Sequence, residues 1–145
     1  MNRLKKLQPI AKINKQQERN AGRVHGEAIR QAESQQKQLD ELINYRKHYL
    51  KTFQLASEAG LTVIQMQEYK LFINRLDDAI TQQEQHVSNN QSKCENSQKE
   101  WMNKRNQYQI MNKVIENRQQ IENQKIEKRE QRELENLPHK SFSNL

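Results

Sequence analysis

The chain has few residues that interrupt a helix, with three glycines and two prolines among 145 residues. Gly60 is the only glycine after Gly26, and no proline lies between Pro9 and Pro138. Because glycine and proline are the residues that most often end or break helices, this scarcity predicts two long helices joined by one reversal. Gly60 suits the left-handed position that follows the last turn of a helix.

Apolar residues are also few. Only 32% of the chain is hydrophobic, and the mean hydropathy is -1.24. That is too little to fill the core of a compact domain, but it is enough for a narrow seam between paired helices. Disordered and prion-like chains share such polarity and richness in glutamine. The sustained apolar period described below argues against both for most of the chain.

Cysteine and long hydrophobic runs are the other shortages. Cys94 is the only cysteine, so an internal disulfide is excluded, and a small buried residue in a reducing compartment is the simplest interpretation. The chain has no run of about 18 apolar residues and no signal-peptide pattern at its start. We therefore expect a cytoplasmic protein that does not span a membrane.

The residues around Gly60 locate the reversal. Thr62 and Gln65 have the spacing of a capping box. In this motif each side chain accepts a hydrogen bond from the backbone N–H of the other residue. Leu61 and Met66 stand where a hydrophobic staple would fix the entry of the chain. These signals predict an all-α fold: one antiparallel coiled-coil hairpin over residues 1–137, with helices over about 3–58 and 63–136, a bend at 59–62, and a disordered tail at 138–145.

Alternating steps of three and four define a seam on each predicted helix. The first helix places on it Leu4, Leu7, Ala11, Asn14, Glu18, Ala21, His25, Ala28, Ala32, Gln35, Leu39, Leu42, Arg46, Tyr49, Phe53 and Ala56. The second places on it Met66, Tyr69, Ile73, Leu76, Ile80, Gln83, Val87, Asn90, Cys94, Ser97, Trp101, Lys104, Tyr108, Met111, Ile115 and Arg118. Folding at residue 60 pairs residues whose numbers sum to about 120. Phe53 is then expected to meet Met66 to Tyr69.

Near the bend each helix has a second apolar stripe beside the seam. The extra stripes contain Gln38, Leu42, Tyr45 and Tyr49 before the bend, and Phe72, Leu76 and Ala79 after it. A two-stranded coiled coil buries one narrow seam per helix, so this surplus must stay exposed, self-associate or receive a partner. The alternative is that the helices are broad here and pack all of it.

Charge gathers away from the bend. Residues 1–23 hold seven Lys or Arg against one acid, and residues 99–129 hold eight against four. These segments lie together in the predicted hairpin and could bind nucleic acid, an acidic membrane face or an acidic protein cavity, or could simply be solvated. The basic segments contain few aromatic residues and no nucleic-acid-binding module, and Trp101 is expected to pack in the seam.

No catalytic or metal-binding pattern is present. His25, His48, His86 and His139 have no ligand spacing to one another or to Cys94. There is no glycine-rich phosphate loop, and two paired helices offer no deep pocket for a nucleophile and its base. We expect no enzymatic activity, no metal and no cofactor.

Two motifs around the bend resemble a known family. They are Leu42-Ile43-x-Tyr45-x-x-x-Tyr49 before the bend and Tyr69-x-x-Phe72-Ile73-x-x-Leu76-x-x-Ala79-Ile80-x-x-Gln83 after it, with Trp101 and Lys104-Arg105 downstream. In this spacing the chain resembles the FliJ family of the bacterial flagellar type III export apparatus, over nearly its whole length. The alternatives are a generic coiled-coil adaptor, an injectisome stalk protein or a basic nucleic-acid-binding coiled coil.

The resemblance implies a non-enzymatic coupling protein. Family members form a coiled coil similar to the shaft of rotary ATP synthases. Their open end enters the hexameric ring of the export ATPase, an exposed patch binds the export gate protein FlhA, and they bind export chaperones. The expected location is cytoplasmic, peripherally associated with the inner membrane at the flagellar base, without contact to nucleic acid.

The resemblance also implies two sets of binding residues. The gate-protein patch carries over as Gln38, Leu42, Tyr45, Tyr49, Phe72, Leu76, Ala79 and Gln83, the last standing where a member of the family has histidine. The residues expected to bind the ATPase ring are Lys5, Lys6, Lys12, Lys15, Arg19, Arg23, Lys104, Arg105, Lys113 and Arg118.

Overall fold

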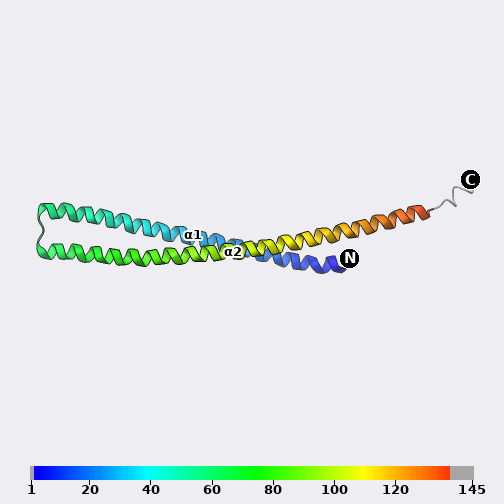
Figure 1. Cartoon of the computed structure of the whole chain (residues 1–145), viewed down its shortest axis with the longest axis horizontal. Helices are drawn as coiled ribbons and strands as arrows, with labels where there is room; N and C mark the ends of the chain where they lie inside the picture. Colours follow the sequence, from blue (N-terminus) through cyan, green and yellow to red (C-terminus); the bar gives the residue numbers. More distant parts are fainter. Residues whose placement is uncertain (1, 138–145) are drawn as a thin grey trace, which may run out of the picture. The chain divides into compact units, whose positions relative to one another are not determined.

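The computed structural model describes residues 2–137, which form two helices and no strand. Helix α1 covers Asn2–Ala59 and helix α2 covers Val63–Asn136 (Figure 1). The predicted all-α fold with a longer second helix is confirmed. The tail predicted to be disordered, residues 138–145, lies outside the described residues.

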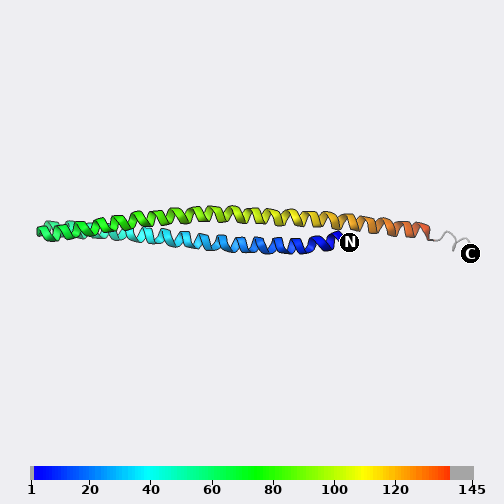
Figure 2. The same cartoon turned by 90° about the horizontal axis from the view of Figure 1, so that it is seen from below.

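Contacts divide the chain into two compact units. One unit is Ala21–Glu100, which contains the bend, and the other combines Met1–Asn20 with Trp101–Leu145. Both helices contribute to both units. Within Ala21–Glu100, the two helices run antiparallel side by side from the bend, as Figures 1 and 2 both show. The single hairpin domain over residues 1–137 stays a prediction.

The bend has the backbone geometry that its sequence predicts. Gly60 has a φ of 100°, a conformation that favours glycine, and its N–H donates to the carbonyl oxygen of Ser57 at 3.2 Å. The capping box is present: the N–H of Gln65 donates to Thr62 Oγ1 at 3.2 Å, and the N–H of Thr62 donates to Gln65 Oε1 at 3.1 Å. Helix α2 therefore begins with two of its unpaired donors satisfied locally.

The predicted seam is confirmed along both helices. Every seam position named above is buried or half-buried, and paired residues obey the predicted sum, as in Gln35 with Gln83 and Phe53 with Tyr69. The buried core is thin, since its only apolar members among the described residues are Leu39, Leu76 and Val87. Each such side chain contributes about 1.5–3 kcal/mol, so stability must come from many partly buried positions along the seam.

Polar side chains bridge the helices at defined points. In the unit that contains the bend, His25 Nδ1 lies 2.8 Å from Ser97 Oγ, and this hydroxyl donates to the Cys94 carbonyl at 2.9 Å. In the other unit, the Trp101 indole N–H donates to Glu18 Oε1 at 3.0 Å, so Trp101 packs in the seam as expected. Such directional contacts favour one register over neighbouring ones.

Helix α2 continues beyond the last paired positions. Glu122 is half-buried, whereas every residue from 123 to 137 is exposed. This segment alternates acidic and basic side chains, a pattern that supports a solvated helix. Across the two described helices, no stretch is both long and apolar enough to cross a bilayer.

Candidate docking face near the bend

Five aromatic rings gather on the bend side of the unit Ala21–Glu100. Tyr45, Tyr49 and Phe53 follow one another at steps of four on α1, so their rings share one face, and Tyr69 and Phe72 meet them from α2. The ring centroids of Tyr49 and Phe72 lie 4.4 Å apart, and those of Phe53 and Tyr69 lie 5.2 Å apart. Aromatic pairs at such distances add about 0.5–1.5 kcal/mol beyond the burial of their area. The cluster therefore ties the helices together.

The apolar face is wider than the seam, as the sequence predicts. Ile43, Leu50, Phe72 and Ala79 lie off the seam and are nevertheless half-buried. The helices thus pack part of the surplus against each other. They do not pack all of it, because Tyr45 remains 52% exposed while its ring stands edge-on to Phe72 at 6.2 Å.

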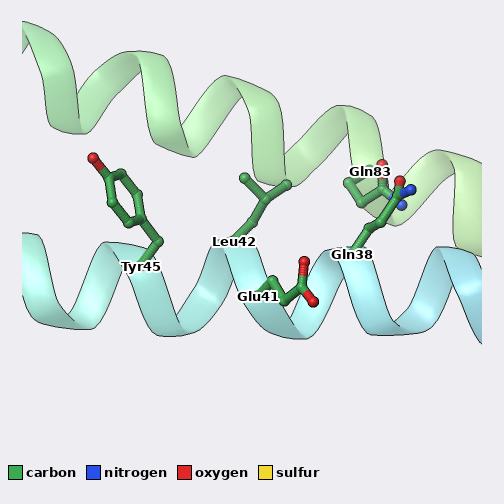
Figure 3. Close-up of a pocket in the computed structure, with 5 residues that line it drawn as sticks. All are labelled: Gln38, Glu41, Leu42, Tyr45 and Gln83. Atoms are coloured by element: carbon green, nitrogen blue, oxygen red, sulfur yellow. The ribbon is translucent and has the colours of Figure 1, made fainter.

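A groove adjoins the exposed tyrosine. It has a volume of about 430 Å³ and is lined by Gln38, Glu41, Leu42, Tyr45 and Gln83. Helix α1 supplies four of these residues and α2 supplies Gln83, which lies across from Gln38 in Figure 3. The groove combines an aromatic ring, a leucine, a carboxylate and amide groups. It therefore offers apolar contact together with hydrogen-bond partners, which is the usual make-up of a protein-binding site.

Gln83 is held in place by the seam. Its side chain is buried, and Nε2 donates to the Gln35 carbonyl oxygen at 2.9 Å and to Gln35 Oε1 at 2.8 Å. Both N–H groups of this amide therefore donate within the hairpin. Neither of these two hydrogen bonds uses the side-chain oxygen Oε1. Gln83 closes the groove on the α2 side as a fixed wall.

The structure separates the predicted gate-binding residues into two groups. Gln38, Leu42, Tyr45 and Gln83 line the groove, and Tyr49 and Phe72 contact Tyr45. Leu76 is buried and Ala79 is half-buried, so Leu76 supports the face from beneath. All eight residues lie in the unit that contains the bend.

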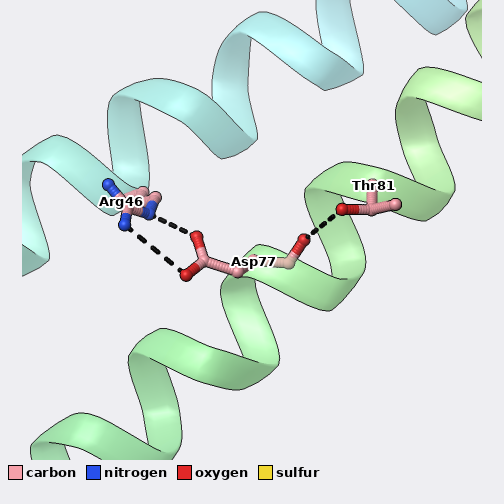
Figure 4. A network of polar contacts seen from close by, with 3 residues as sticks. All are labelled: Arg46, Asp77 and Thr81. Carbon is pink, nitrogen blue, oxygen red and sulfur yellow. Dashed lines mark hydrogen bonds and ion pairs between the residues drawn. The ribbon is translucent and has the colours of Figure 1, made fainter.

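Two features of this region were missed by the sequence reasoning. Glu41 lines the groove, although it was not among the predicted site residues. Arg46, which was assigned only to the seam, pairs through Nε and Nη2 with the carboxylate of Asp77, and Thr81 donates to the Asp77 carbonyl at 3.0 Å (Figure 4). The pair could have been predicted from its residue numbers, because their sum is close to the value of about 120 expected for facing residues.

The surroundings of Tyr49 shift the pKa of its hydroxyl. Burial raises the pKa of its hydroxyl above the ordinary value, and Tyr69, Tyr45 and Glu68 raise it further because they disfavour a nearby phenolate. The neutral form is therefore favoured in the folded state.

We expect Tyr49 to link stability to alkaline pH. Well below pH ~10 the Tyr49 hydroxyl keeps its proton in both the folded and the unfolded state. The stabilisation that Tyr49 gives to the fold is then fully present. As pH rises through the ordinary pKa, the unfolded chain loses its proton first, and the free energy of unfolding falls until the folded pKa is passed. The difference in phenolate absorbance between the wild type and Tyr49→Phe reports this titration. A Tyr49 titration at or below that of free tyrosine would contradict the expectation.

The predicted ring-binding cations lie mainly in the other unit. Lys5, Lys6, Lys12, Lys15 and Arg19 are exposed on α1, and Lys12, Lys15 and Arg19 line a groove of about 390 Å³ with Gln16 and Asn20. On α2, Arg105 and Lys113 are exposed, whereas Lys104 and Arg118 are half-buried. Arg23 is exposed but belongs to the unit Ala21–Glu100.

Metal-ligating side chains do not converge in the described region. Within residues 2–137, no three His, Cys, Asp or Glu side chains are placed to hold a metal ion. The described surface instead presents an aromatic face with a groove in one unit and exposed cations in the other.

Comparison with known proteins identifies a family over almost the full length. The family model described as "Flagellar FliJ protein" matches residues 3–143. No curated protein and no solved structure gives a significant match.

Proposed function

The chain belongs to the FliJ family, whose members are components of flagellar protein export, and from this premise we propose that it couples the export ATPase ring to the export gate protein FlhA. The observation on which the proposal chiefly depends is the exposed Tyr45 beside its groove. A family match to flagellar proteins favours the flagellar system over an injectisome.

The gate protein is proposed to bind the groove and its aromatic rim. Tyrosine is enriched among the residues that dominate binding energy, because it offers a large contact area with few rotatable bonds. Tyr45 is in ring contact with Tyr49 and Phe72, so part of its freedom is already lost before a partner covers it. Glu41 and Gln38 at the groove supply polar contacts around this apolar centre.

The ATPase ring is proposed to receive the basic unit formed from the ends of the chain. Its exposed Lys and Arg side chains are solvated in the free protein, and charges of one sign favour a cavity lined by the opposite sign. Both helices of the unit contribute cations, since Lys12 and Arg19 lie on α1 and Arg105 and Lys113 on α2.

Binding of export chaperones and a place at the inner membrane of the flagellar base complete the proposal. Both are what membership of the family implies. In this scheme the chain acts without catalysis, by contact alone.

The proposal is tested by adding the purified chain to its cognate export ATPase and measuring ATP hydrolysis over a concentration series. We expect the rate to rise and then to saturate as the rings are filled. An unrelated coiled coil of similar net charge controls for general polycation effects. An unchanged rate over the whole series would reject the ring-binding role.

A further inference from the structure

The bend is an apolar, charge-poor tip. Residues 52–67 contain one charged side chain, Glu58, in a chain that is 30% charged. Leu55, Val63 and Ile64 are exposed there, and Val63 at 72% and Ile64 at 69% are the most exposed large hydrophobic side chains of the described residues. Neither the groove nor the seam uses these side chains. Exposure of adjacent apolar residues is costly in water and indicates a binding surface.

Cations follow the tip on both helices. Residues 46–75 hold five Lys or Arg against two Glu, and Arg46 is paired with Asp77. That leaves exposed Lys47 and Lys51 on α1 and exposed Lys70 and Arg75 on α2. At 1.5 Å per residue, Lys51 stands about 12 Å from the end of α1 and Lys70 about 10 Å from the start of α2. Apolar side chains followed by cations at this depth match the acyl boundary and the headgroup layer of an anionic bilayer.

Part of the backbone of the bend is hydrogen-bonded locally. The N–H groups of Gly60, Thr62, Gln65 and Met66 all donate within the bend. Each satisfied donor lowers the penalty of entering a less polar medium. The exposed side chains are aliphatic, whereas centres of protein interfaces favour Tyr, Trp and Arg. The aliphatic character of these side chains favours a lipid surface over a protein pocket as the partner of the tip.

We propose that the tip formed by Leu55, Val63 and Ile64 inserts into the interface of an anionic membrane, with Lys47, Lys51, Lys70 and Arg75 contacting lipid headgroups. This surface is distinct from the groove at Tyr45, and the proposal does not depend on the ring or gate contacts. The tip would anchor the chain at the bilayer without crossing it, and the groove would stay open to a protein partner.

The test is flotation of the full chain with vesicles of phosphatidylcholine, pure or with about one third phosphatidylglycerol. We expect binding to the anionic vesicles and at least about tenfold weaker binding of the double variant Val63→Asp with Ile64→Asp. The matched control is Ile13→Asp with Ile110→Asp, which replaces two similarly exposed isoleucines outside the tip and changes the net charge equally. This control should bind almost as well as the wild type, and Glu58→Lys should bind more tightly.

Each other outcome overturns the proposal. Equal losses in the tip and control variants would mean that net charge alone attracts the chain to the vesicles. Retained binding by the tip variant would exclude insertion. The wild type could instead sediment as a dimer and fail to bind vesicles, while the tip variant sediments as a monomer. That result would assign the tip to contact between two copies of the chain. Circular dichroism of every variant verifies that the helices are intact.

Discussion

Tyr45→Ala is expected to weaken binding of the gate protein FlhA by about 30-fold or more, because truncation of a central interface tyrosine typically costs at least about 2 kcal/mol. Tyr45 is the exposed ring of the aromatic cluster and lines the groove with Leu42. The variant removes the ring and leaves the groove without its rim. Titration calorimetry with the cytoplasmic domain of the gate protein measures the loss.

The same substitution is expected to leave the hairpin folded. Half of the Tyr45 side chain is already in water, so its removal should cost about 1–2 kcal/mol, mainly from lost ring contacts. That is below the ~2–5 kcal/mol for truncating a buried leucine such as Leu76. Leu71→Ala is the matched control, since Leu71 is 54% exposed and lies outside the groove. It should bind like the wild type. Loss of helical circular dichroism in Tyr45→Ala, or an equal loss of binding in Leu71→Ala, would contradict the assignment of Tyr45 as a contact residue.

The fold was largely predictable because its determinants are local or periodic. Gly60 and the pair Thr62 and Gln65 act within a few residues of one another, so their spacing alone predicts the bend. The heptad pattern then defines the seam, because a step of three or four residues returns a side chain to the same side of a helix. Once the bend is known, the pairing of the helices follows by counting from it.

The candidate site was predictable only in outline. The seam and the surplus stripes indicate which side chains lie on the wide face. Which of these side chains is buried, like Leu76, and which is exposed, like Tyr45, depends on how each helix is rotated about its axis. The amide of Gln83 shows the same limit. Its two bonds to Gln35 need facing positions at hydrogen-bond distance, and a seam pattern defines position only to within about one turn. The Arg46 pair with Asp77 likewise joins a seam residue to one beside the seam.

Neutralising four cations of the basic unit is expected to abolish most of the stimulation of the export ATPase. The variant replaces Lys5, Lys12, Lys15 and Arg19 with glutamine, which lowers the formal net charge from +7 to +3. All four side chains are exposed, so the helix should tolerate the change. If each contact contributes about 0.5 kcal/mol at the ring, the half-maximal concentration should rise about 30-fold.

Charge and position are separated by a control with the same net charge. Changing Lys47, Lys51, Lys70 and Arg75 to glutamine also gives +3, but these cations lie near the bend. This control should stimulate the ATPase like the wild type, because these four cations lie outside the unit that the ring is proposed to receive. Raising the salt concentration should reduce stimulation by the wild type more than by the first variant, since screening acts on charges that are present. If both variants lost stimulation equally, the net positive charge of the chain would explain its effect on the ATPase. Specific insertion of the chain ends into the ring would then be rejected.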